Sequence, residues 1–448
     1  GRVQTLAVKI ICDREKEIAN FVPQEYWTIT ARLRENDKAP IFDADVIKFN
    51  GKKLEINNAE EAAKTEAALK EAAYIVEKAD KKERKRNPLP PYTTSSLQQD
   101  AVKKLNFSTK KTMLLAQQLY EGVNVGKGGA VGLITYMRTD SVRLSDVATA
   151  ELRSFIGSTY GAEYVPAGVN VYSSKKNAQD AHEAIRPTSV ERTPEAVAQY
   201  LTKDQLKLYT LIWKRTVACQ MKAAVYDVTT LLIGAAGYQL RAGGAVLKFD
   251  GFLKLSDKKE LAGEKEKEVP YLPEQTPLKL HKLMPAEQHF TEPPPHFTEA
   301  TLVKELEEKG IGRPSTYSPT IQTILDRGYI VKDGKKLVST ELGELIVNML
   351  TTYFKDIINI PFTANLETEL DEIAEHEANK ETVLENFYEP FSHLLQKADK
   401  EIETVEAPVE VSDVKCEKCG RMMVYKQGRY GKFLACPGFP ERRIWRNR

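Results

Sequence analysis

A tyrosine, an arginine and an aspartate alternate along the segment LITYMRTDS, residues 133–141. If this segment is extended, the side chains of Tyr136, Arg138 and Asp140 point the same way, because alternate residues of an extended chain share a face. A phenol is protonated and weakly nucleophilic at neutral pH, but a fixed guanidinium stabilises its phenolate and also binds phosphate oxygens. The three residues therefore suit phosphoryl transfer. The competing interpretation is a half-buried strand with a packed tyrosine and a surface ion pair.

The residues around Tyr136 favour the catalytic interpretation. LITYMRTDS resembles the active-site segment of type IA DNA topoisomerases, where the tyrosine attacks a DNA phosphodiester and stays linked to the 5′ phosphate. Met137 is typical of the bacterial topoisomerase I branch, since the topoisomerase III branch has proline there. Further segments that resemble the family, in the family's order, are GRVQ (1–4), QDAHEAIRPT (179–188), LVKELEEKGIGRPSTYSPTI (302–321), PFTANLETELDEIA (361–374) and the cysteine-containing segment from Cys416.

The resemblance implies that Tyr136 cleaves one DNA strand, another strand passes and the break is religated, which relaxes negatively supercoiled DNA. Transesterification keeps the bond energy in the phosphotyrosine, so religation needs no ATP, and the sequence contains no G-x-x-x-x-G-K-[ST] segment. Arg138 is expected to neutralise charge on the phosphate. His182 is expected beside the tyrosine, with Asp140 or the phosphate as its partner. It either transfers a proton or only orders the local hydrogen bonds.

Arg313 in GIGRPSTY is a second candidate for a phosphate contact. Gly310 and Gly312 allow a close approach of the backbone, and Pro314 begins a helix whose N-terminus favours anions. The competing interpretation is an ordinary capped turn. By resemblance, the residues expected to contact DNA are Gly1, Arg2, Val3, Gln4, Arg138, Arg313, Ser315 and Thr316.

Three of the five cysteines gather near the C-terminus, where Cys416 and Cys419 have the spacing of a zinc ribbon and Cys436 is a third candidate ligand. The family closes this pattern with a fourth cysteine, but Arg442 occupies that place here. Three thiolates bind zinc only with water or an outside ligand, so we expect a partial ribbon, with Zn²⁺ as a candidate cofactor.

Composition limits the remaining alternatives. The chain has 448 residues, a net charge of +2 and 42% hydrophobic residues, so it has real cores and any DNA-binding surface must be local. Cys12 and Cys219 are expected to be buried thiols, which fits a reducing bacterial cytoplasm. No apolar run reaches membrane-spanning length. We expect a monomer that binds single-stranded and negatively supercoiled DNA and uses neither ATP nor a membrane.

By resemblance, cleavage depends on Mg²⁺ held by acidic residues of a Toprim domain. We expect that domain to precede Gly1 and the chain to be a fragment that does not relax DNA alone. Two alternatives remain open: a topoisomerase III-like decatenase, and a non-catalytic scaffold that binds single-stranded DNA. A tyrosine recombinase is disfavoured, because it uses a different set of arginines and histidines and forms a 3′ linkage.

The expected fold is multidomain α+β: the type IA toroid, with helical and winged-helix domains, a β-rich arch and a partial zinc ribbon. Hydrophobic spacing predicts helices over 1–20 and 60–78, strands within 25–57 and 223–255, and a winged-helix order over 299–353. The expected domains are a helical base (1–31 and 296–400), a β-rich arch (32–95 and 223–295), a helical domain with the tyrosine (96–222), a linker (401–415) and the ribbon (416–448).

Overall fold

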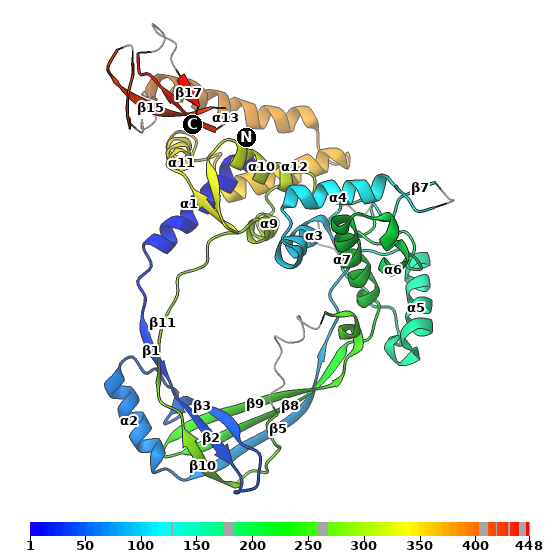
Figure 1. Cartoon of the computed structure of the whole chain (residues 1–448), viewed down its shortest axis with the longest axis vertical. Helices are drawn as coiled ribbons and strands as arrows, with labels where there is room; N and C mark the ends of the chain where they lie inside the picture. The colour runs from blue at the N-terminus through cyan, green and yellow to red at the C-terminus, as the bar shows by residue number, and fades with distance from the viewer. Residues whose placement is uncertain are drawn as a thin grey trace.

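The elements of the chain follow one another around a ring (Figure 1). This computed structural model describes residues 1–126, 129–173, 182–257, 268–402, 411–417, 419–428, 431–438 and 445–447. Residues 258–267, and residues 403–410 of the predicted linker, lie outside these ranges. The ring has three parts, named here the base, the arch and the tyrosine lobe, and a small sheet follows the base.

The base joins the first helix of the chain to helices nearly three hundred residues later. α1 (Arg2–Ala19) packs against α9 (Glu299–Glu308), α10 (Tyr317–Asp326), the hairpin β12–β13 (Ile330–Asp333 and Lys336–Ser339) and α11 (Glu341–Tyr353). The apolar spacing of α1 explains this, because Leu6, Ala7, Ile10 and Ile11 are all buried in one core with those elements. The predicted helix, helix, wing, helix order is present. α12 (Ile360–Ala374) and α13 (Lys380–Glu401) complete the base.

The arch is a seven-stranded antiparallel sheet in the order β2-β10-β5-β8-β9-β3-β4. Its strands come from two distant stretches of chain: β2 (Thr30–Arg34), β3 (Phe42–Phe49), β4 (Lys52–Lys53) and β5 (Tyr74–Arg86), then β8 (Ala224–Ala235), β9 (Tyr238–Phe249) and β10 (Pro277–Leu283). β1 (Glu25–Thr28) pairs with β11 (Glu287–Phe290), and these two segments connect the arch to the base (Figure 1).

The helix predicted over 60–78 is wrong in its second half. α2 ends at Lys70, and residues 74–86 form β5, which pairs along its length with β8. The charged run KKERKR, residues 81–86, belongs to this strand. Tyr74 and Val76 are buried in the sheet core, and the ladder offered by β8 outweighs the helical propensity of Glu77 and Lys78.

The tyrosine lobe is helical and is inserted between β5 and β8. It contains α3 (Thr94–Asp100) with a π-helical turn to Leu105, α4 (Thr109–Glu121), the short pair β6–β7 (Val123–Asn124 and Ala130–Val131), α5 (Asp146–Tyr160), α6 (Pro194–Val197) and α7 (Lys203–Cys219). Thr93 and Ser108 cap α3 and α4 by accepting hydrogen bonds from the first helical turn.

The ring closes where α9 of the base meets α3 and α4 of the tyrosine lobe (Figure 1). Glu299 Oε2 accepts hydrogen bonds from the backbone nitrogen and the hydroxyl of Thr109, at 2.6 and 2.8 Å. Glu307 Oε2 accepts from Ser95 Oγ at 2.7 Å. The apolar cores of the two parts stay separate on either side of this contact. The closure is therefore held by polar contacts that water can replace.

A four-stranded antiparallel sheet ends the chain: β14 (Val411–Lys415), β15 (Met422–Gly428), β16 (Gly431–Ala435) and β17 (Trp445–Asn447). Cys12 and Cys219 are buried thiols, as predicted. Among the described helices, none combines the length and apolar character needed to cross a lipid bilayer.

Candidate active site

A cavity of about 590 Å³ lies where the tyrosine lobe faces the base. The lobe contributes Tyr120, Tyr136, Arg138, Thr139, Asp140 and His182 to its wall, and the base contributes Arg313, Pro314, Ser315 and Asp371. The structure therefore brings six sequence-predicted residues of the tyrosine lobe and base loop together across the closure of the ring. These six are Tyr136, Arg138, Asp140, His182, Arg313 and Ser315.

The segment around Tyr136 alternates as predicted, although it forms no regular strand. Met137 and Thr139 are buried in the lobe, whereas Tyr136, Arg138 and Asp140 line the cavity. Thr94 Oγ1 donates to the carbonyl oxygen of Met137 at 2.6 Å and accepts from the backbone nitrogen of Thr139. The start of α3 therefore anchors the segment, which bends at Met137 and Arg138, through its two buried residues and leaves Tyr136, Arg138 and Asp140 at the cavity.

The segment AIRPT lies alongside the residues before Tyr136. Thr135 N donates to the carbonyl oxygen of Arg186 at 2.9 Å, and Thr188 N donates to that of Leu133 at 3.0 Å. This pairing joins positions about fifty residues apart in the sequence. It places His182 next to the tyrosine, with the two ring centroids 5.4 Å apart. The ring of Tyr120 lies on Tyr136 edge-on, with its centroid at 5.5 Å.

Arg186 does not face the cavity. Its Nε donates to Glu183 Oε2 at 2.8 Å. Glu183 also accepts from the backbone nitrogen of Ser145, the cap of α5. Burial raises the pKa of Glu183, but the hydrogen bonds from Ser145 and Arg186 outweigh it and leave the pKa below its ordinary value. The pair therefore orders the loop that carries His182.

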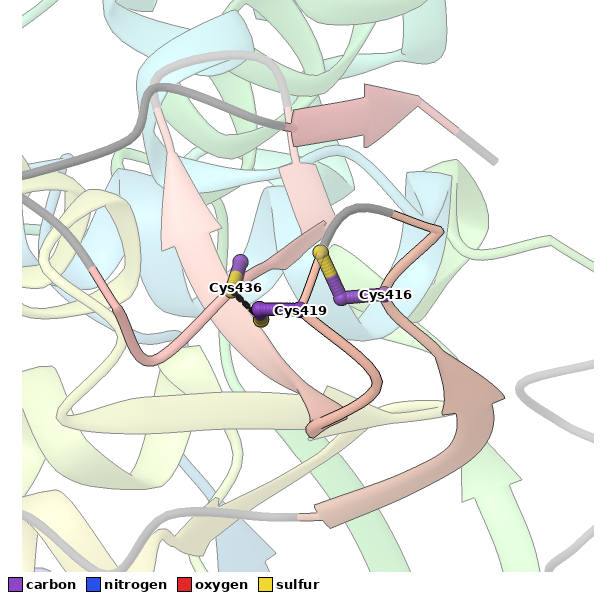
Figure 2. A group of neighbouring side chains, drawn as sticks. All are labelled: Cys416, Cys419 and Cys436. Atoms are coloured by element: carbon purple, nitrogen blue, oxygen red, sulfur yellow. Dashed lines mark hydrogen bonds between the residues drawn. The ribbon is translucent and has the colours of Figure 1, made fainter.

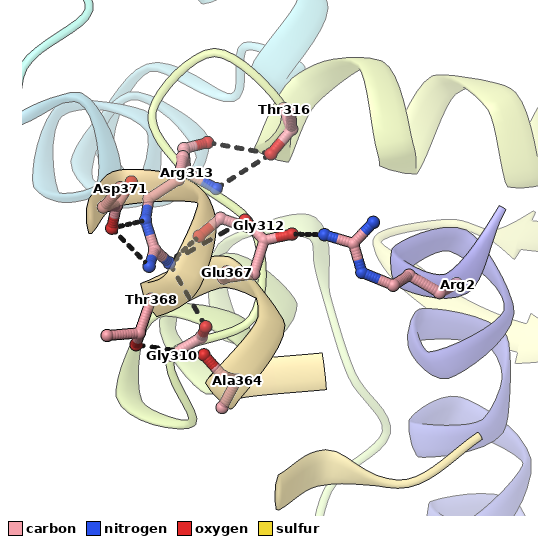
Figure 3. Close-up of polar contacts among 9 residues, drawn as sticks. All are labelled: Arg2, Gly310, Gly312, Arg313, Thr316, Ala364, Glu367, Thr368 and Asp371. Carbon is pink, nitrogen blue, oxygen red and sulfur yellow. Dashed lines mark hydrogen bonds and ion pairs between the residues drawn. The ribbon is translucent and has the colours of Figure 1, made fainter. Parts of the chain in front are cut away.

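Arg313 enters the cavity from the loop between α9 and α10, but its guanidinium turns toward α12 (Figure 3). Nε and Nη2 both donate to Asp371 Oδ2, at 2.9 and 2.7 Å. Nη1 donates to the carbonyl oxygens of Gly310 and Gly312, at 3.2 and 2.8 Å. Both glycines have positive φ angles, +69° and +77°, which only glycine adopts without strain.

The GRVQ residues lie beyond Glu367, whose side chain separates Arg2 from Arg313 (Figure 3). Gly1 precedes α1, and Arg2, Val3 and Gln4 form its first turn. Arg2 Nη2 pairs with Glu367 Oε1 at 2.5 Å, one helical turn before Asp371 (Figure 3). None of these four residues lines the cavity. Ser315 does, while the hydroxyl of Thr316 accepts from the backbone nitrogen of Arg313. Their DNA contacts stay a prediction.

The sequence analysis missed Asp371 and Glu367 as partners of the two arginines. A signal was present: the two carboxylates are four residues apart in LETELD, which places them on one face of a helix. It was incomplete, because spacing does not say what that face meets. Tyr120 was also missed, since no polar residue beside it in the sequence indicates a site.

The three C-terminal cysteines converge at the turn after β14 and the end of β16 (Figure 2). Their sulfur atoms lie within 4.8 Å of one another, and the Sγ atoms of Cys419 and Cys436 are 3.3 Å apart. Zinc–sulfur bonds of about 2.3 Å in a tetrahedron place sulfur atoms about 3.8 Å apart, so this cluster fits three zinc ligands. The sequence has no cysteine after Cys436.

Comparison with known proteins agrees with these features. The sequence model described as DNA topoisomerase matches residues 1–385, and the one described as topoisomerase DNA binding C4 zinc finger matches residues 413–446. The solved structure of full-length topoisomerase I from Thermotoga maritima is similar, with 37% identity and a TM-score of 0.77 over 98% of this chain and 69% of that one. This confirms the toroidal fold expected from the motifs. The chain belongs to the DNA topoisomerase family and has the type IA fold.

Proposed function

We propose that this chain carries the strand-cleaving part of a bacterial type IA topoisomerase that relaxes negatively supercoiled DNA without ATP. The observation that carries the proposal is the cavity at the closure of the ring, because Tyr136 faces basic groups from both sides of it. We expect it to act as a monomer in the bacterial cytoplasm, at the nucleoid. These expectations and the domain boundaries given above stay predictions.

The proposed reaction is a transesterification. The oxygen of Tyr136 attacks the phosphorus of a single-stranded DNA phosphodiester, and the bond to the 3′-side oxygen breaks, leaving a 3′ hydroxyl and a 5′-phosphotyrosine. Arg138 offsets the charge that develops on the phosphate, a contribution of about 3 kcal/mol in comparable sites. His182 is suited to accept the phenolic proton, because its ring lies against that of Tyr136. The reverse attack by the 3′ hydroxyl restores the strand.

The proposed gate is the polar closure between α9 and the tyrosine lobe. Once Tyr136 is esterified, the lobe holds one DNA end, and the base is expected to hold the other. Breaking the contacts of Glu299 and Glu307 with the lobe would separate the two ends without exposing either apolar core. A second strand then passes through the opening.

Metal ions enter the proposal in two places. Mg²⁺ dependence stays a prediction, and no step above runs through a metal; when bound near a phosphate, Mg²⁺ neutralises its charge. Zn²⁺ would be held by Cys416, Cys419 and Cys436, with its fourth ligand from outside the cysteine set.

Replacing Tyr136 with phenylalanine tests the function. In the protein expressed from its full gene, Tyr136→Phe should bind single-stranded DNA with unchanged affinity and should not relax negatively supercoiled plasmid, because only the attacking oxygen is removed. Tyr200→Phe, in the same lobe but outside the cavity, should relax plasmid normally. Relaxation by Tyr136→Phe would refute the proposal, and full binding without relaxation by the unmodified protein would favour the non-catalytic alternative.

A further inference from the structure

Asp371 is the one acidic residue of the base that lines the cavity. Both of its contacts with Arg313 are hydrogen bonds to the same oxygen, at 2.9 and 2.7 Å, from two different nitrogens of the guanidinium. The side chains are only 20% and 23% exposed, so water screens the pair weakly.

The same guanidinium also holds its own loop together. Its Nη1 donates to the carbonyl oxygens of Gly310 and Gly312, and the backbone nitrogen of Arg313 donates to Thr316 Oγ1 at 2.8 Å. An arginine side chain has five N–H groups. Four of those of Arg313 donate hydrogen bonds: two to Asp371, one to Gly310 and one to Gly312. Arg313 is therefore a brace that ties the loop between α9 and α10 to α12 (Figure 3).

This brace determines what the base presents to Tyr136. Pro314 and Ser315 follow Arg313 directly and line the cavity, and α10 begins two residues later at Tyr317. With the guanidinium fixed, the loop has little freedom to move Ser315 away from the cavity. Within the described part of the chain, the second N–H of Nη2 makes no hydrogen bond, so it is available for a phosphate. Glu367 supports the arrangement, because it lies 3.9 Å from Arg313 Nη1 while it pairs with Arg2.

We propose that Asp371 is a positioning residue for strand cleavage: it fixes Arg313, and through it Ser315, against the DNA phosphate that Tyr136 attacks. The inference rests on the proposed function, because it assumes that the cavity receives a DNA phosphate. It differs from simple competition, in which Asp371 would occupy the place of a phosphate on Arg313 and hinder binding. The two arrangements predict opposite signs for the removal of the Asp371 charge.

Binding of a fluorescent single-stranded oligonucleotide to the present chain, measured by anisotropy at several salt concentrations, distinguishes them. Positioning predicts that Asp371→Asn weakens binding about tenfold, since a small misplacement of binding groups is costly. The slope of log affinity against log salt should stay unchanged, because no phosphate contact is gained. Asp371→Glu should recover part of the affinity. Glu369→Gln, the same charge change on the exposed face of α12, should have no effect.

A double-variant comparison tests the route through Arg313. Adding Arg313→Lys to Asp371→Asn should weaken binding no further than either change alone, because both remove the same brace. In the protein expressed from its full gene, Asp371→Asn should also slow covalent cleavage at saturating DNA. If the variant only bound DNA more weakly, saturating DNA would restore its cleavage rate to that of the unmodified protein.

Three outcomes would overturn the inference while leaving the proposed function standing. Tighter binding by Asp371→Asn, with a slope steeper by about 0.7, would show that Asp371 competes with a phosphate. Equal affinities of Asp371→Asn and Glu369→Gln would show that Asp371 has no part in binding. Additive losses in the double variant would show that the two residues act separately. Failure of the unmodified protein to bind DNA would instead overturn the proposed function, and this inference with it.

Discussion

At the scale of residues, Tyr136 and Tyr317 at the closure of the ring have very different surroundings. Tyr317 is 5% exposed, and burial raises the pKa of its hydroxyl, with the negative charge of Glu307 adding to the effect and Arg313 opposing it. A phenol held in its protonated form cannot act as a nucleophile. Tyr136 instead lines the cavity between His182 and Tyr120. Burial therefore separates a structural tyrosine from the candidate nucleophile.

His182 gives a prediction at this scale. If it transfers the phenolic proton, His182→Ala should change the pH dependence of the cleavage rate, because the variant lacks the group that accepts the proton. The measurement is the rate of covalent adduct formation against pH, in the protein expressed from its full gene. His393→Ala, on the exposed surface of α13, serves as the control. An unchanged pH profile in His182→Ala would leave His182 only the role of ordering its neighbours.

The residues near Tyr136 could be predicted from the sequence, and those across the cavity could not. Alternation alone places Arg138 and Asp140 on the face of Tyr136, because it is a property of the local backbone. The pairing of Arg313 with Asp371 spans 58 positions and depends on how α12 packs against the loop after α9. The contact between α12 and this loop cannot be predicted from a single sequence, so the role of Asp371 as the partner of Arg313 became visible only in the structure.

At the scale of elements, tertiary pairing explains the clearest error of the sequence analysis. Apolar spacing predicted the winged-helix order over 299–353, although the helix expected to begin at Pro314 begins at Tyr317. The stretch 74–86 became a strand because β8 offers it eleven paired positions and its apolar residues reach the sheet core. In this stretch, the helical propensity of the residues contributes less than the pairing with β8.

Glu299 gives the prediction for the closure of the ring. It is 5% exposed, accepts two hydrogen bonds from Thr109 and pairs with Lys332 of the wing. Hydrogen bonds to a charged group are worth about 2 kcal/mol, so Glu299→Gln should raise hydrogen exchange at the start of α4 by about thirtyfold. Mass spectrometry of peptides that cover Thr109 measures this.

Glu308→Gln is the matched control, because Glu308 is an exposed residue of the same helix, 3.7 Å from Lys304. Exchange at α4 should be unchanged in that variant. If both variants gave the same exchange, Glu299 would not hold the closure, and the proposed gate would need another contact.

At the scale of the whole molecule, the ring is built so that its closure is weaker than its parts. Each part has its own apolar core, while the closure consists of α9 carboxylates on the first turns of α3 and α4. The favourable interaction of an anion with a helix N-terminus strengthens such contacts without apolar burial. This division suits a molecule that must open one contact repeatedly and keep its domains folded.

The C-terminal sheet gives a further prediction. With three cysteine ligands, the purified chain should contain zinc that EDTA removes without unfolding the ring, because the metal ties only β14, β15 and β16 together. Cys436→Ser should lower the zinc content measured by elemental analysis, and Cys12→Ser, a change in the base core, should not. Equal zinc content in the two variants would show that these sulfurs are not the ligands.

The central claim concerns which end of a broken DNA strand becomes attached to Tyr136. The direct measurement uses one oligonucleotide labelled at either its 3′ or its 5′ end, incubated with the protein expressed from its full gene and then denatured. A 5′-phosphotyrosine predicts that only the 3′ label migrates with the protein, and that this signal disappears in Tyr136→Phe. Retention of the 5′ label, or a labelled adduct in Tyr136→Phe, would contradict the account.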